Sequence, residues 1–165
     1  MKVYKFGGAS VRNADGVRNL RKIIDDEQNL FIIVSAMGKT TNLLETLCNA
    51  YFHRDSKTVA IMEELKNFHL DIVNSLFPLN APVYKNLDEL FTSLGNILNT
   101  ESSLCYDYEY DRIISFGELI STTIISHYLR LKDIDNLFID IRKYLKTDQN
   151  YPVSYTHLTL PTNSR

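Results

Sequence analysis

A strand, a pair of glycines, an amphipathic helix and a second strand are predicted within the first 34 residues. Residues Lys2–Phe6 form a short, partly apolar run that ends at Gly7 and Gly8. After Asn13, a residue suited to capping a helix, apolar residues recur at spacings of three and four. Leu30–Val34 is an unbroken apolar run, typical of a strand buried on both faces of a parallel sheet. This order predicts an α/β fold.

The middle of the chain, from residue 41 to about residue 131, carries mostly helical periodicity. Two amphipathic patterns are separated by prolines, and a third follows Gly117. Residues Leu137–Ile141 are again apolar and branched, which predicts a further buried strand.

The composition excludes several classes of protein. The chain has 165 residues, of which 44% are hydrophobic and 23% charged, so it is long enough to bury a core. A formal net charge of −2 argues against binding to nucleic acid or to a membrane surface. The two cysteines and four histidines lack metal-ligand spacing, so we expect no metal site. The first residues lack the apolar stretch of a secretory signal or membrane anchor, so we expect a cytoplasmic protein.

The glycine turn after the first strand is the first candidate site. Gly7 and Gly8 allow backbone N–H groups to approach an anion with no side chain in the way. Lys5, at the end of the strand, adds a positive charge. These residues suit phosphate binding; the alternative is that the glycines only turn the chain and Lys5 is solvated.

The loop after the second strand, Ser35–Asn42, is the second candidate site. It contains Gly38–Thr40, which reads Gly-Lys-Thr, but a P-loop needs another glycine five residues earlier, where this chain has Ile33. Hydroxyl groups at the carboxyl end of a strand still suit ligand binding, because open α/β sheets bind ligands at that edge. The alternative is that a threonine or asparagine here only caps the following helix.

Glu118, in the segment Ser115–Thr122, is the third candidate. It has apolar neighbours on both sides, and burying a glutamate costs free energy unless the charge is paired. The ammonium group of a substrate would pair it. The alternative is an exposed glutamate on the polar face near the start of a helix.

Together, the three segments resemble the aspartate kinases of the amino-acid kinase family. Those enzymes typically open with Lys-Phe-Gly-Gly-Thr-Ser-Val, and this chain reads Lys-Phe-Gly-Gly-Ala-Ser-Val at residues 5–11. The resemblance extends over residues 1 to about 150, and the order and spacing of the segments carry it. Besides residues 5–11, the similar segments are Phe31–Asn42, Ser115–Thr122, Asp140–Lys143 and Thr147–Asp148.

The resemblance implies transfer of the γ-phosphoryl group of ATP to the side-chain carboxylate of L-aspartate. The product, 4-phospho-L-aspartate, leads to lysine, threonine and methionine. Mg²⁺ is then carried by the nucleotide rather than by a protein site. By analogy, Lys5 neutralises charge on the transferring phosphoryl oxygens, the backbone at Gly7 and Gly8 donates to the phosphates, and Ser10 supports the loop.

The resemblance also implies an aspartate site and a fold. The hydroxyls of Ser35 and Thr41 would hold aspartate, and Glu118 would pair with its α-ammonium group. The implied fold is a three-layer α/β sandwich similar to carbamate kinase, with a mainly parallel sheet. The parent protein would be a homo-oligomer that binds L-aspartate and ATP. An alternative is a family member that acts on another amino acid or on a carbamate. The segments Ser35–Asn42 and Ser115–Thr122 argue against it, because they resemble aspartate kinases more than the other members of the family.

The chain departs from the family pattern in two places. Ala9 replaces the usual threonine and removes one hydroxyl from the phosphate loop. The family's kinase domain continues well beyond this length, so we expect residues 1–150 to be the N-terminal part of an incomplete domain, inactive by itself. Such a part would leave a sheet edge and an apolar face uncovered, which favours association.

Residues 151–165 match nothing in the family pattern and resemble the translation of a sequencing adapter. We expect a non-native or disordered tail, and the alternative is a genuine short paralogue with a divergent end. A function of another class also fits the chain: a stand-alone aspartate-binding or regulatory module without phosphoryl transfer.

Overall fold

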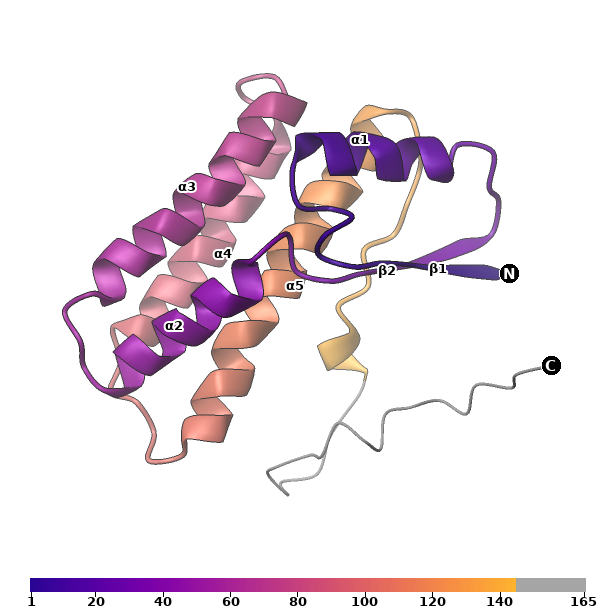
Figure 1. Cartoon of the computed structure of the whole chain (residues 1–165). Coiled ribbons are helices and arrows are strands. Elements are labelled where there is room, and N and C mark those ends of the chain that lie inside the picture. Colours follow the sequence, from indigo (N-terminus) through magenta and orange to yellow (C-terminus); the bar gives the residue numbers. More distant parts are fainter. Residues whose placement is uncertain (145–165) are drawn as a thin grey trace.

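The computed structural model describes residues 1–144 and contains a small sheet beside a layer of helices (Figure 1). The elements are β1 (Lys2–Phe6), α1 (Ala14–Ile23), β2 (Leu30–Val34), α2 (Thr40–Phe52), α3 (Thr58–Leu76), α4 (Pro82–Leu98), α5 (Tyr106–Leu131) and the 3₁₀ helix η1 (Ile141–Lys143). The two strands predicted first, the helix between them and the helical middle are confirmed. The predicted tail, residues 151–165, lies outside the described residues.

Strands β1 and β2 pair in parallel, as the predicted strand–helix–strand order requires. The register runs from Lys2 opposite Leu30 to Phe6 opposite Val34, and α1 connects the strands. The side chain of Asn13 caps α1 by accepting a hydrogen bond from the Gly16 N–H at 2.9 Å, as predicted. Because the strands are parallel, both carboxyl ends lie at the same edge of the sheet.

The two faces of the sheet have different surroundings. The inward face packs into the core through Tyr4, Phe6, Ile32 and Val34. On the outer face, three apolar side chains are 40–55% exposed: Val3, Phe31 and Ile33. The prediction that the second strand is buried on both faces is therefore wrong for residues 1–144, since none of their elements covers the outer face. The predicted uncovered apolar face is present.

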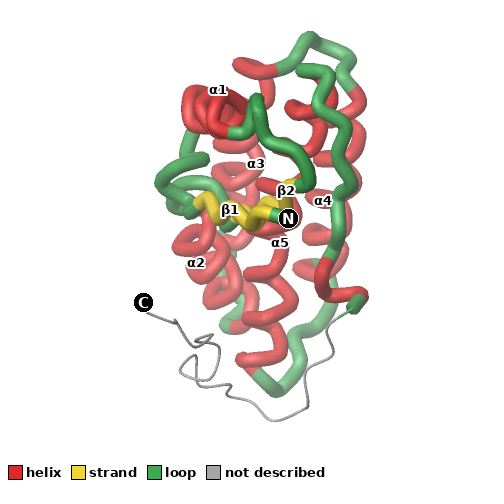
Figure 2. The backbone as a smooth tube through the Cα atoms, turned by 90° about the vertical axis from the view of Figure 1, so that its right-hand side faces the viewer, coloured by secondary structure: helices red, strands yellow, loops and turns green. Residues whose placement is uncertain are grey.

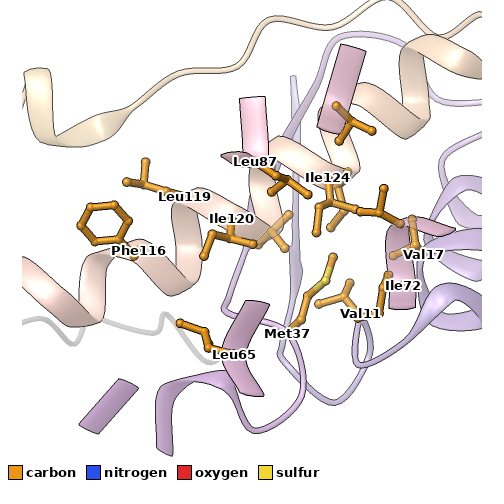
Figure 3. Close-up of a cluster of buried hydrophobic side chains, with 14 of the residues drawn as sticks. Val11, Val17, Met37, Leu65, Ile72, Leu87, Phe116, Leu119, Ile120 and Ile124 are labelled. Atoms are coloured by element: carbon orange, nitrogen blue, oxygen red, sulfur yellow. The ribbon is translucent and has the colours of Figure 1, made fainter. Parts of the chain in front are cut away.

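Helix α5 is the central element of the helical layer. It packs against α1, α2, α4 and β2, and Figures 1 and 2 show the helices α2–α5 beside the sheet with α1 above the strands. Ile120 and Ile124 of α5 are fully buried in one cluster with Val11 and Met37, the latter from the loop after β2 (Figure 3). None of the helices described here has the length and apolarity needed to cross a bilayer.

The segment that follows α5 corrects one prediction. Residues 137–141 are not a strand: residues 137–140 have no regular secondary structure, and Ile141 begins η1. Leu137 is 81% and Ile139 40% exposed, while Phe138 packs on the core. An apolar, branched run becomes a strand only when a neighbouring strand supplies a hydrogen-bond ladder. Within residues 1–144 no strand pairs with this segment. Asn136 instead attaches it to α5 by accepting from the Ser126 hydroxyl at 2.6 Å.

Candidate functional site

The glycine turn after β1 and the loop after β2 meet at the carboxyl edge of the sheet. The Ser35 N–H donates to the Phe6 carbonyl at 3.0 Å, and the Gly38 N–H donates to the Gly8 carbonyl at 3.0 Å. These two bonds continue the pairing of the strands into the following turns. Two candidate segments that are 28 residues apart in sequence, Gly7 to Ser35, are thereby held side by side.

Close backbone approach explains why Gly8 is a glycine, and backbone conformation explains Gly38. A Cβ atom on Gly8 would lie 2.5 Å from the Ala36 carbonyl oxygen, so the turn could not approach the loop with any other residue there. Gly38 has φ +56°, in the left-handed region that glycine adopts without strain. By contrast, a Cβ on Gly7 would meet no atom within 4 Å. The space beside Gly7 is open to a ligand, whereas Gly8 is part of the packing.

Glu118 reaches the same loop from helix α5. Its Oε1 accepts a hydrogen bond from the Ala36 N–H at 3.4 Å. The neighbouring Gly117 makes this possible, because a Cβ atom there would lie 2.8 Å from the Cβ of Ala36. Glu118 is exposed, and it lies in the middle of α5 rather than near a helix start. Glu118 is therefore exposed, as the alternative interpretation expected, but its carboxylate also contacts the second candidate loop.

Ser35 and Thr41 flank the buried part of this loop. Both side chains are half-buried, and within residues 1–144 neither hydroxyl makes a hydrogen bond. The alternative that a side chain here caps the helix is wrong, since the N-cap of α2 is Lys39 and forms no side-chain capping bond. Both hydroxyls are therefore free to bind a ligand.

Lys5 and Ser10, which lie before and after the two glycines of the turn, are both exposed. Lys5 alternates with Phe6, which is buried, so its side chain lies on the outer face of the sheet. In the described part of the chain Lys5 has no ion pair and no side-chain hydrogen bond. The Ser10 N–H donates to the Gly7 carbonyl at 2.9 Å and closes the turn. Within residues 1–144 no hydrogen bond or ion pair joins Lys5 to Glu118, so polar contacts tie together the two loops and Glu118 but not the Lys5 side chain.

A groove extends from Glu118 along β2 and α5 to the segment after α5, with a volume of about 880 Å³. Its walls are mostly apolar, and one of its polar clusters lies close to Glu118. There the Arg142 guanidinium donates to the Ser115 hydroxyl at 3.1 Å and forms an ion pair with Asp140 at 2.8 Å. The hydrogen bonds from Arg142 hold the pKa of Asp140 below its ordinary value. Residues 1–144 contain no group of three or more metal-binding side chains.

Sequence reasoning selected the Thr40 hydroxyl together with those of Ser35 and Thr41, but it missed the buried partner of Thr40, His69. Thr40, the first residue of α2, is buried, and its hydroxyl lies 3.2 Å from Nε2 of the fully buried His69. The available signal was that His69 interrupts an apolar stripe through Leu65 and Ile72 on one face of its helix. That pattern shows burial but not the partner, which lies 29 residues away.

The model of the amino acid kinase family matches residues 1–160, and the chain belongs to this family. Its relatives include the aspartokinase of Chlamydia trachomatis, which is 26% identical over 90% of this chain and 32% of the relative. Aspartokinase 2 of Arabidopsis thaliana, a chloroplastic protein, is 33% identical over 77% of this chain and 24% of the relative.

A solved structure supports the fold. The crystal structure of Escherichia coli aspartokinase III in complex with aspartate and ADP superposes with a TM-score of 0.79 at 24% identity. The match covers 90% of this chain and 33% of the relative. The predicted incomplete α/β fold of the amino-acid kinase type is therefore confirmed. The chain spans about a third of the length of the bacterial aspartokinases that it matches.

Proposed function

We propose that this chain is the N-terminal portion of an aspartate kinase, which transfers the γ-phosphoryl group of ATP to the side-chain carboxylate of L-aspartate. The single observation that carries the proposal is the convergence on one loop. Gly8 and Glu118, which are 110 positions apart, both contact the backbone between Ala36 and Gly38. The choice of substrates is supported by relatives named aspartokinase, one of which is solved in complex with aspartate and ADP.

Aspartate would bind between the loop after β2 and helix α5. Glu118 is the anionic group available to the α-ammonium of the substrate, and it is already oriented by the Ala36 N–H. The hydroxyls of Ser35 and Thr41 are free to donate to substrate carboxylate oxygens. Fixing both ends of a short amino acid in this way would direct the side-chain carboxylate toward the nucleotide.

The phosphates would bind at the turn after β1. A carboxylate oxygen of aspartate attacks the γ-phosphorus, the bond to the β-phosphate oxygen breaks, and ADP leaves as 4-phospho-L-aspartate forms. Lys5 would neutralise charge on the transferring oxygens, and the backbone at Gly7 and Gly8 would donate to the phosphates, with Ser10 closing the turn. Mg²⁺ enters with the nucleotide as part of the substrate.

The chain alone would bind substrate without turning it over. Lys5 and Glu118 share no hydrogen bond or ion pair within residues 1–144, and the chain spans a third of its bacterial relatives, so the groups that would close the site are expected in the remaining length. We also propose that the parent protein is a cytoplasmic homo-oligomer in amino-acid biosynthesis. The alternative is a stand-alone aspartate-binding or regulatory module, which binds aspartate in the same way and transfers no phosphoryl group.

Calorimetric titration of the chain with L-aspartate tests the proposal. We expect saturable binding that Glu118→Gln weakens at least tenfold, because the charged hydrogen bond is lost. Succinate, a dicarboxylate without the α-ammonium, serves as the matched ligand. It should bind weakly to the wild type and should be insensitive to Glu118→Gln. Equal affinity of the wild type for succinate and aspartate would contradict the role of Glu118.

Formation of aspartyl hydroxamate with MgATP tests the reaction. The chain alone should give no product, and the same residues within the complete reading frame should give turnover that Lys5→Ala abolishes. Product from the chain alone would show that it is a complete kinase. Aspartate binding without turnover in the complete protein would support the binding module.

A further inference from the structure

Three other segments contact the loop between β2 and α2: the glycine turn, helix α5 and helix α3. Gly8 accepts from the Gly38 N–H, and Glu118 accepts from the Ala36 N–H. The remaining contact is the hydrogen bond between Thr40 and His69, 3.2 Å long and fully buried. Phe68 lies against the same loop, because a Cβ built on Gly38 would be 3.3 Å from its ring.

The hydrogen-bond partners of His69 fix which nitrogen carries the proton. Nδ1 lies 2.8 Å from the Leu65 carbonyl, which can only accept, so Nδ1 is protonated. Burial lowers the pKa of His69 to about 4, so the ring is neutral near pH 7 and Nε2 carries a lone pair. The Thr40 hydroxyl therefore donates to Nε2, and its orientation is set.

Within residues 1–144, His69 has no polar partner besides the Leu65 carbonyl and the Thr40 hydroxyl. Its ring lies edge-on to Phe68 at 5.0 Å and near Phe91 at 6.1 Å. An unpartnered ring nitrogen in this apolar environment would cost free energy, so breaking the bond to Thr40 is unfavourable for both groups. The contact between Thr40 and His69 lies next to the candidate site, because Thr40 is the first residue of α2 and Thr41 follows it directly.

We infer that His69 is a positioning residue, which fixes the start of α2 through the Thr40 hydroxyl and so places the Ser35–Thr41 loop for its ligand. Its effect on aspartate rests on the proposed function, whereas its effect on the loop does not. His69 contacts no reacting atom and acts only through Thr40. The consequence is that a buried side chain on α3 sets the affinity of a site formed by β2 and α5.

Thr40→Val tests the inference, because it removes the hydroxyl with little change of shape. We expect the Ala36 and Gly38 amide resonances to shift in ¹⁵N–¹H spectra and the affinity for L-aspartate to fall about three- to tenfold. Thr40→Ser keeps the hydroxyl and should restore both. His69→Leu should reproduce Thr40→Val, and combining the two changes should add little.

Tyr51→Phe is the matched control, since Tyr51 lies near the other end of α2 and its hydroxyl donates to the Thr100 carbonyl at 3.2 Å. It should leave the loop resonances and the aspartate affinity unchanged. If the wild type binds no aspartate, the proposed function fails and the amide shifts alone decide the inference. Folded Thr40→Val protein with unshifted Ala36 and Gly38 amides would overturn it, as would a wild-type His69 protonated at Nε2.

Discussion

Ile120 in α5 has no exposed surface, whereas Ile33 in β2 keeps 46% of its surface exposed. These two side chains illustrate how the helical layer and the sheet differ in burial. A helix makes its backbone hydrogen bonds within itself, so α2–α5 can pack to completion from a limited stretch of chain. A strand needs neighbours along both edges and cover over both faces. Within residues 1–144, β2 has one neighbouring strand, β1, and one covered face. A piece of an α/β domain thus completes its helices before its sheet.

The largest expected effect is on stability. Ile120→Ala should lower the free energy of unfolding by about 2–5 kcal/mol, because it leaves a cavity at the centre of the helical layer. Ile33→Ala should lower it by less than about 1 kcal/mol, since water already reaches that side chain. Urea denaturation followed by circular dichroism measures both. Equal losses would show that the outer face of the sheet is covered in solution.

Association should depend on the sheet and not on the helices. We expect the chain to associate in light scattering after size exclusion, because the outer face exposes Phe31 and Ile33. Changing both residues to lysine should yield a monomer with little loss of stability. Leu79→Lys, on a residue 77% exposed beyond α3, should leave association unchanged. A monodisperse wild-type monomer would refute this account of the outer face.

The smallest expected effect concerns an ion pair at the sheet. Glu27 accepts from the Lys2 ammonium at 2.7 Å and from the Tyr4 hydroxyl at 2.6 Å. Hydrogen bonds from Lys2 and then Tyr4 hold the pKa of Glu27 below its ordinary value of 4.5. A lowered folded-state pKa stabilises the chain above pH 4.5, and that stabilisation is lost as the pH falls through the lower value.

Glu27→Gln removes this titration. Thermal unfolding of the wild type should therefore approach that of Glu27→Gln as the pH falls from 5 toward 3, with a separation above pH 5 of only a few degrees. A separation that grows on acidification would reverse the sign and contradict the ion pair.

The sequence predicts correctly those features of the fold that depend on a few consecutive residues. The Asn13 cap, the glycine turn and the strand β2 each depend on a few consecutive residues, and all three are present as predicted, although β2 is buried on one face only. The failed predictions concern neighbours. Residues 137–141 have the composition of a strand, but no strand lies beside them in residues 1–144. Composition indicates that a segment can pair, and tertiary structure decides whether it does.

The candidate site shows the same division. The glycine turn and the loop after β2 were recognisable because each carries its chemistry in consecutive residues. Glu118 could be selected as a charge among apolar residues, but its contact with Ala36 depends on the crossing of α5 over the loop, which Gly117 permits. His69 could not be found, because a buried histidine in an apolar stripe is most often only part of the core. Its partner is fixed by how α3 packs on α2.

The position of α5 in the sequence also affects synthesis of the chain. Val34, the last residue of β2, shares one buried cluster with Ile124 of α5, a helix that packs against β2, and the ribosome adds Ile124 90 residues later. At a translation rate of about 5–20 residues per second, a completed βαβ unit stays without that contact for roughly 5–18 s. That interval is long compared with the formation of a helix. The nascent chain thus presents the apolar inner face of its sheet to the cell for seconds, which makes it a natural client for chaperones that bind extended hydrophobic segments.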